Sequence, residues 1–331
     1  MFPIYIKLSF GIVELNSKLL GISCVILAHV FFTTQDMTIK FINGDYALYQ
    51  VMLIRSIVAM LFTLIIFVPI DGGFKYLRTQ RLGLHLLRGF GIVVANLCFF
   101  TALITMPLAE VVAIFFIAPL LITALSEFLI GEKVGLRSWI AVLVGLLGVM
   151  IILRPGFGLF NPASILPLVA ALAYALVQIT TRKMGVTEKA STMSFYIQLN
   201  LVVVSSLMGL IFGDGNLADS SEPTLYYLFR PWTFLSWGDS MIIIGIGLIN
   251  GLAAYFISQA YRISKAGIIA PFEYVALPLS IFWSITIFGD WPDILSWLGM
   301  VLIAGAGLYV VYNESVQGRN NILYGPMPRN R

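Results

Sequence analysis

Charged residues are scarce in this chain. Lysine, arginine, aspartate and glutamate make up 11% of its 331 residues, whereas hydrophobic residues make up 59%. A soluble domain carries about a quarter charged residues, so this chain has too few polar groups to cover a water-facing surface. The mean hydropathy of +0.94 agrees with this interpretation. The composition therefore excludes an ordinary soluble globular protein.

Cysteine and histidine are also scarce, with two residues of each. Cys24 and Cys98 fall inside apolar stretches, where two thiols make neither a disulfide framework nor a metal cluster. His29 and His85 are too few for a histidine-based catalytic motif, and no phosphate-binding GxxxxGK[ST] loop is present. The basic residues are spread along the loops rather than clustered. We therefore expect no enzyme activity, no metal or other cofactor and no nucleic-acid partner.

The chain does contain apolar blocks of about 20 residues separated by short polar breaks, the length that crosses a ~30 Å hydrocarbon layer. The blocks cover residues 18–38, 47–69, 84–105, 108–130, 136–153, 163–183, 192–212, 240–261, 266–288 and 293–312. Breaks such as "GEKVGLRS" (131–138) and "GDWPD" (289–293) carry helix-stopping residues. The sequence thus predicts an all-α membrane protein with ten transmembrane helices.

The basic residues indicate the orientation of these helices. If the breaks alternate between two sides, 16 Lys and Arg residues fall on one side, 3 on the other, and Arg55 lies inside a span, which accounts for all 20. Cytoplasmic loops of membrane proteins collect Lys and Arg. We therefore expect the N- and C-termini to be cytoplasmic.

The two halves of the chain resemble each other. Residues 102–152 align with residues 260–311 at a nearly constant offset of 158, and "LAHVFFTTQD" (27–36) aligns loosely with "LAYALVQITT" (172–181). The first register pairs Ala102 with Ala260, Gly131 with Gly289, Glu132 with Asp290 and Trp139 with Trp297. Each unit has five helices, an odd number, so the second unit enters the membrane from the opposite side. Inverted repeats around a midplane site are typical of secondary transporters.

Two segments carry a family resemblance: "RGFGIVVANLCFFTALITMPLAEVVAIFFIAPLLITALSEFLIGEKV" (88–134) and "SKAGIIAPFEYVALPLSIFWSITIFGDWPD" (264–293). Together with the glycine-rich fifth and tenth helices, they resemble the paired EamA repeats of the drug/metabolite transporter superfamily. The resemblance covers about residues 17 to 313. It places a first repeat at 17–153, a second at 160–313 and a cytoplasmic tail at 314–331.

The resemblance implies ten helices, cytoplasmic termini and a central cavity lined mainly by helices 1, 3, 4, 6, 8 and 9. It also implies alternating-access movement of small metabolites, since family members handle amino acids, riboflavin or S-adenosylmethionine. Pro271 and Tyr274 match the proline–tyrosine run of the ninth helix in the last two groups, whereas Glu273 between them has no assigned counterpart.

The predicted function is a secondary transporter that moves a small polar or zwitterionic metabolite across a bacterial cytoplasmic (inner) membrane. Two alternatives stay open: an exporter of amino acids or drug-like compounds, and a membrane scaffold or sensor that transports nothing. The expected partners are the small-molecule substrate and the lipid bilayer. Protons as a driving ion, and a homodimer formed through glycine-rich helix faces, stay open as well.

Polar side chains inside the spans are the candidates for a substrate pathway, because the bilayer penalises them unless they face protein or water. His29, Thr33 and Asp36 share one face of the first helix, and Tyr174 and Gln178 repeat this arrangement in the sixth. The remaining candidates are Asn96, Asn250, Ser258, Glu273 and Tyr274. The alternative for each is a hydrogen bond that only holds neighbouring helices together.

The charged residues have several interpretations. Glu273 could take up a proton, bind a cationic group of the substrate or accept hydrogen bonds from backbone freed by Pro271 and Pro278. We expect its carboxylate to face a wet central cavity. Asp36 and Arg55 could neutralise each other as a structural pair, which we favour, or Arg55 could bind a carboxylate or phosphate of the substrate.

Overall fold

The computed structural model describes residues 2–42, 46–131, 135–153, 162–185, 187–216, 218, 223–264 and 269–324, and in these ranges the chain is helical with no strand. The α-helices are α1 (Phe2–Phe41), α2 (Leu48–Phe62), α3 (Val68–Ile70), α4 (Leu82–Thr105), α5 (Leu108–Phe115), α6 (Ala118–Ile130), α7 (Leu136–Leu153), α8 (Ile165–Met184), α9 (Ala190–Phe212), α10 (Pro223–Phe229), α11 (Trp237–Ile263), α13 (Ala276–Phe288) and α14 (Ile294–Tyr324). A π-helical turn, η1 (Thr63–Phe67), joins α2 to α3, and 3₁₀ turns form η2 (Phe74–Leu77), η3 (Pro162–Ser164) and η4 (Ala270–Val275).

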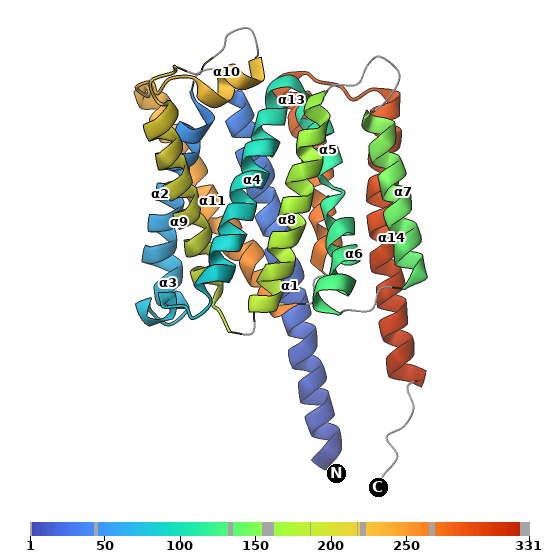
Figure 1. Ribbon diagram of the computed structural model, residues 1–331. Coiled ribbons are helices and arrows are strands. Elements are labelled where there is room, and N and C mark those ends of the chain that lie inside the picture. The colour runs from blue at the N-terminus through green and yellow to red at the C-terminus, as the bar shows by residue number, and fades with distance from the viewer. Residues whose placement is uncertain are drawn as a thin grey trace.

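Most of the helices stand side by side along one axis, and α10 lies across one end of the bundle (Figure 1). Seven segments are long and apolar enough to cross a membrane: Leu19–Phe41, Leu48–Ile70, Leu82–Thr105, Leu108–Ile130, Pro162–Met184, Ala190–Phe212 and Trp237–Ile263. Three shorter apolar helices, at Trp139–Ile152, Phe272–Phe288 and Ile294–Tyr309, lie where the sequence predicts the other three spans. The first turns of α1 and the last turns of α14 project from the same end of the bundle (Figure 1).

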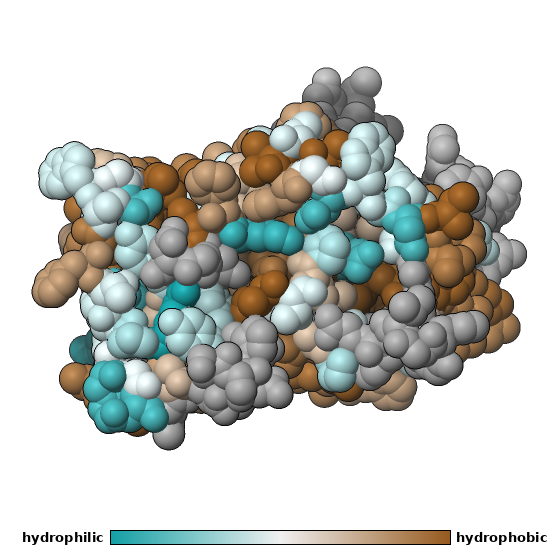
Figure 2. Space-filling view, turned by 90° about the horizontal axis from the view of Figure 1, so that it is seen from above, coloured by the Kyte–Doolittle hydropathy of each residue, from teal (hydrophilic) through white to brown (hydrophobic). Residues whose placement is uncertain are grey.

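The outer surface of the bundle is apolar. Large hydrophobic side chains such as Leu143, Leu210 and Ile294 are well exposed along the helices, as suits contact with lipid rather than water. Figure 2 views the end opposite to the start of α1, where hydrophilic residues gather across the middle and hydrophobic residues occupy one flank. This is a multi-pass membrane protein.

Helices of the first half pack against helices of the second half in a reciprocal pattern. Contacts between the halves include those of α1 with α11, α4 with α8, α2 with α9, α5 with α13, and α7 with α14. If spans are numbered along the chain, the contact of span 1 with span 8 matches that of span 6 with span 3. The contacts of spans 2 with 7, 4 with 9 and 5 with 10 each map onto themselves. The two halves therefore surround one shared interior.

Each half has one span that is interrupted, at corresponding places in the two sequences. In the first half α5 is followed by α6, and in the second half η4 is followed by α13. Proline explains both breaks, because Pro119 and Pro278 have no N–H to donate to the carbonyl one turn earlier. After the breaks, α6 and α13 each run for 13 residues. Both helices end at a glycine in the left-handed conformation, Gly131 with φ 78° and Gly289 with φ 69°, the conformation that ends helices and favours glycine.

Glycines bring α7 and α14 into backbone contact. A Cβ added at Gly299 would lie 2.7 Å from the Gly148 carbonyl oxygen, and one at Gly148 would lie 2.8 Å from that of Gly299. A Gly299→Leu variant is therefore expected to separate the two helices and to lower stability by about 1–3 kcal/mol, the usual cost of overpacking. Thermal unfolding of the purified protein measures this. Gly305→Leu, on the same helix with nothing within 4 Å of the added atom, is the control, and an equal loss in both variants would contradict the prediction.

Candidate functional site

A cavity of about 130 Å³ lies between the two halves of the bundle. One buried water needs about 10–15 Å³ on this measure, so the cavity has room for several waters or a small solute. Its walls come from α1, α2, α4, α5, α8, α9, α11 and α13. The lining agrees with the predicted helices 1, 3, 4, 6, 8 and 9 and adds side chains from helices 2 and 7.

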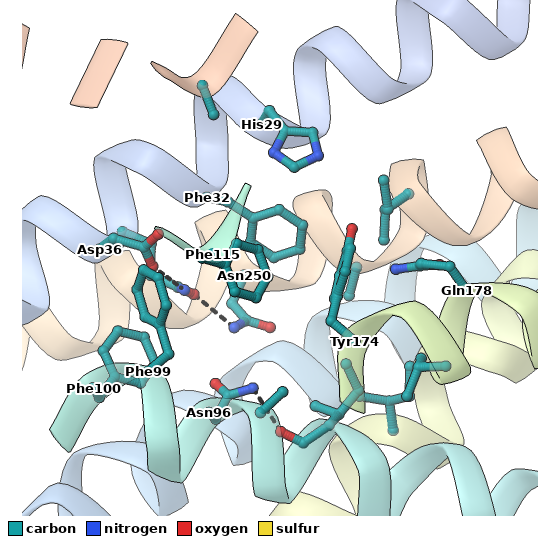
Figure 3. Close-up of a pocket in the computed structure, with 18 of the residues that line it drawn as sticks. His29, Phe32, Asp36, Asn96, Phe99, Phe100, Phe115, Tyr174, Gln178 and Asn250 are labelled. Atoms are coloured by element: carbon teal, nitrogen blue, oxygen red, sulfur yellow. Dashed lines mark hydrogen bonds between the residues drawn. The ribbon is translucent and has the colours of Figure 1, made fainter. Parts of the chain in front are cut away.

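One wall of the cavity is aromatic. Phe99 and Tyr174 each lie with their ring centroids 5.3 Å from that of Phe115, and Phe100 lies 5.5 Å from Phe99. Phe32 and Phe116 also line the cavity. Figure 3 labels five rings of this wall, which lie near one another in the pocket: Phe32, Phe99, Phe100, Phe115 and Tyr174. Such surfaces favour a flat, partly apolar solute, since rings stack or meet edge to face.

A chain of hydrogen-bonded amide side chains also lies in the cavity lining. Gln198 donates to Asn250 Oδ1 over 2.6 Å, and Asn250 in turn donates to Gln35 Oε1 over 2.6 Å. Gln35 then donates to Asp36 Oδ1 over 3.4 Å. These residues come from α9, α11 and α1, and the last two bonds are visible in Figure 3. The chain links three helices and offers donors and acceptors to a polar solute.

Arg55 brings a buried positive charge into the lining. Its side chain is 0% exposed, and Nη2 donates to Asn96 Oδ1 over 2.9 Å. Its Nε and Nη1 atoms have no hydrogen-bond partner in the structure. The guanidinium carbon lies 5.5 Å from the centroid of the Phe100 ring, a distance typical of a cation–π contact. Two donors of a buried cation are therefore left for an acceptor that enters the cavity.

Glu273 lies beside the cavity and not in its lining. Its carboxylate is fully buried, and Oε1 accepts hydrogen bonds from Tyr174, over 3.3 Å, and from Tyr261. Its Oε2 atom lies 3.5 Å from Nε2 of His29. His29 and Tyr174 do line the cavity, so these two side chains stand between the carboxylate and the open space.

The structure brings together eight of the ten pathway candidates. The candidates that line the cavity are His29, Thr33, Asp36, Asn96, Tyr174, Gln178, Asn250 and Ser258. Glu273 and Tyr274 do not line it, which differs from the expectation that Glu273 faces open water. The hydroxyl groups of Tyr174 and Tyr261, from two other helices, contact the Glu273 carboxylate instead. The Thr33 hydroxyl donates a hydrogen bond to the His29 carbonyl over 2.9 Å, which is a local bond within α1.

The favoured Asp36–Arg55 ion pair does not form within 4 Å in the described structure. Both side chains line the cavity, but the guanidinium bonds Asn96 and the carboxylate bonds Gln35. The physical reason is that amides from α1 and α4 are nearer partners for each charge. Arg55 is therefore a cavity residue on a helix that was not expected to contribute.

Sequence reasoning also missed Arg88 and the aromatic wall. Arg88 is fully buried, donates to Thr181 Oγ1 over 2.9 Å and lines the cavity. It lies four residues before Ile92 and eight before Asn96, so helical spacing placed it on the same face as a known candidate. The phenylalanines gave no comparable signal, because lipid-facing and cavity-facing rings are equally apolar.

Comparisons with known proteins agree with this architecture. Residues 19–154 match the model of the EamA-like transporter family. A riboflavin transporter of Vibrio cholerae is 31% identical over 244 residues, which cover 73% of this chain and 76% of the relative. An S-adenosylmethionine uptake transporter of Rickettsia prowazekii is 24% identical over 91% of this chain and 95% of its own.

A solved crystal structure supports the fold independently. It superimposes with a TM-score of 0.65 over 91% of this chain and 98% of its own length, at 18% sequence identity. Identity at that level bears on the fold alone. The similarity to the Vibrio cholerae protein extends over nearly three quarters of both sequences. On the strength of that similarity and of the matched family model, the chain belongs to the EamA-like transporter family.

Proposed function

We propose that this protein is a secondary transporter that takes up a small polar or zwitterionic metabolite by alternating access. The observation that carries the proposal is one cavity, at the junction of the two halves, with aromatic, amide and guanidinium groups together in its lining. A membrane scaffold would not need a lining of this kind. The bacterial relatives named as uptake or riboflavin transporters support the class of function and the bacterial cytoplasmic membrane as its location.

The lining suggests the chemical class of the substrate. Riboflavin and S-adenosylmethionine, the compounds in the relatives' names, both join a flat nitrogen heterocycle to a hydroxylated, polar remainder. The Phe99–Phe115–Tyr174 wall suits the flat ring. The amide chain from Gln198 to Gln35 suits hydroxyl and ring heteroatoms. We therefore propose a metabolite with a heterocycle and a polar tail.

The alternating movement would follow from an inverted repeat, with one unit at 17–153 and the other at 160–313. The reciprocal helix contacts and the equal lengths of α6 and α13 support two pseudo-equivalent units. In this proposal the ten apolar helices all cross the membrane. The surplus of Lys and Arg on one side puts both termini, and the tail at 314–331, in the cytoplasm; residues 325–331 of that tail lie outside the described ranges.

Contacts between the halves cross both ends of the bundle and would have to open in turn. At the end of α1, the Lys40 ammonium of the first half lies 3.7 Å from the Asp290 carboxylate of the second half. At the other end, Asp71 accepts from the Ser191 backbone N–H over 3.0 Å and from Tyr255 over 3.3 Å. Both sets are partly exposed polar contacts, which exchange for water at little cost.

Uptake into proteoliposomes tests the proposal. Purified protein reconstituted with labelled riboflavin or S-adenosylmethionine outside is expected to fill the vesicles faster than empty liposomes do. An excess of the same unlabelled compound should abolish the difference. Uptake that the unlabelled compound abolishes identifies which of the two compounds is carried. If both compounds enter at the empty-liposome rate, the proposed substrate class is wrong.

A further inference from the structure

A histidine and a glutamate meet beside the cavity without completing a bond. His29 of α1 is 4% exposed and Glu273 of η4 is 0% exposed. Nε2 of the histidine and Oε2 of the glutamate lie 3.5 Å apart, and neither atom has a hydrogen-bond partner in the structure. Buried polar atoms are rarely left unpaired. A proton placed between these two atoms would satisfy both at once.

The other carboxylate oxygen is held by hydroxyl groups. Glu273 Oε1 accepts hydrogen bonds from Tyr174 of α8 and Tyr261 of α11. Hydrogen bonds of this kind favour the charged form of a carboxylate, and a proton on the His29 imidazole would pair with it. The resulting pair of opposite charges is neutral overall. That matters in a membrane, where an isolated charge is unfavourable.

No other charge in the described structure competes for this carboxylate. The remaining titratable neighbour is Tyr274 on η4 itself. Among the elements packed against η4, α13 and residues 294–309 of α14 contain no charged residue. On α6, Glu127 accepts a bond from Trp139 over 3.1 Å. On α1, Asp36 bonds Gln35, and Lys40 lies 3.7 Å from the Asp290 carboxylate. His29 is thus the side chain that can bring a proton to Glu273.

Comparison of the two halves shows that the fold does not require this pair. In the sequence alignment of the halves, His29 falls opposite Tyr174, and Glu273 falls opposite Phe115. The contact that the repeat makes equivalent, which also joins the two halves, is therefore that of Tyr174 with Phe115, two rings with centroids 5.3 Å apart. An apolar aromatic contact fills the position there. The His29–Glu273 contact instead brings together two titratable groups, one from each half, where rings would serve packing alone.

We propose that His29 and Glu273 form a proton-binding site, in which a proton on His29 Nε2 is held by the Glu273 carboxylate. His29 lines the cavity, so water in the cavity brings the proton and a substrate touching the same ring alters its binding. By linkage, the proton then alters substrate binding by the same factor. The coupling to transport rests on the proposed function, whereas the proton site itself does not.

Histidine NMR of the whole purified protein tests the proton site without any substrate. The chain has only two histidines, so labelled histidine gives two sets of ring signals that a His85→Gln variant assigns. The His29 signal is expected to change as the pH is varied across the range in which the protein stays folded. In Glu273→Gln, the proton affinity of His29 should fall at least tenfold, since the counter-charge 3.5 Å away is lost.

The second histidine supplies a matched control. Nε2 of His85 lies 3.6 Å from Oε2 of Glu188, so Glu188→Gln changes the same kind of neighbour at a distant place and should leave the His29 signal unchanged. Tyr261→Phe is a milder variant should Glu273→Gln fold poorly. It removes one hydroxyl from Oε1, which concentrates charge on the carboxylate and should raise the proton affinity of His29.

Two results would overturn the proposal. One is a wild-type His29 signal that stays constant across this pH range. The other is an unchanged His29 titration in Glu273→Gln and Tyr261→Phe. Absence of riboflavin or S-adenosylmethionine uptake in proteoliposomes would not produce either result, because no substrate enters the NMR experiment. The proton site and the proposed transport function can therefore fail separately.

Discussion

An Arg55→Gln variant is expected to transport its substrate about 10- to 100-fold less efficiently than the wild type. Arg55 is fully buried in the cavity wall, and its Nε and Nη1 atoms have no partner. A hydrogen bond to a charged group is worth about 1.5–3 kcal/mol, and each 1.4 kcal/mol is tenfold in affinity. If the free donors bind a carbonyl, carboxylate or phosphate oxygen of the substrate, glutamine removes that contribution. Initial uptake rates over a range of substrate concentrations measure the loss.

Arg55→Lys is the control for the charge alone. Lysine keeps the positive charge near Asp36 and Phe100 but lacks the planar guanidinium that can bind two acceptors at once. We expect it to retain more activity than glutamine and less than the wild type. If instead Arg55 only supports packing, both variants would lose thermal stability, and transport by the folded fraction would be normal. That result would mean that Arg55 has the structural role that the sequence analysis favoured.

Much of the architecture could be predicted because it follows from local sequence. Apolar blocks of membrane-spanning length, and glycines at helix ends, are readable without knowledge of contacts. The offset of 158 anticipated that α6 and α13 begin and end at matching residues. The 3₁₀ form of residues 270–275 and the π turn at 63–67 were not anticipated.

The candidate site could be predicted only for its polar members. Asn96, Gln178 and Asn250 were recognisable because an amide in an apolar helix must face protein or water. The aromatic wall was not recognisable, since phenylalanine suits lipid and cavity alike. The position of Glu273 behind the wall depends on Tyr174, which lies 99 residues away in the chain. A contact of that range leaves no trace in the local pattern.

An Ala254→Trp variant is expected to abolish transport while leaving the fold intact. Ala254 is 6% exposed and lines the cavity from α11. An indole there would occupy most of a space of only about 130 Å³, and the substrate would have to displace a packed ring. Uptake should fall to the empty-liposome level. Substrate should also no longer raise the thermal stability of the purified protein, because a ligand stabilises only what it binds.

Leu248→Trp on the same helix is the matched control. Leu248 is 40% exposed and does not line the cavity, so an indole there points toward lipid and should leave uptake unchanged. The pair of variants separates blockage from a general intolerance of α11 to bulk. If the Ala254→Trp variant took up substrate as fast as the wild type, the substrate would have to pass outside this cavity. The aromatic, amide and guanidinium groups around this cavity would then be packing groups, and the proposed pathway between the two halves would be wrong.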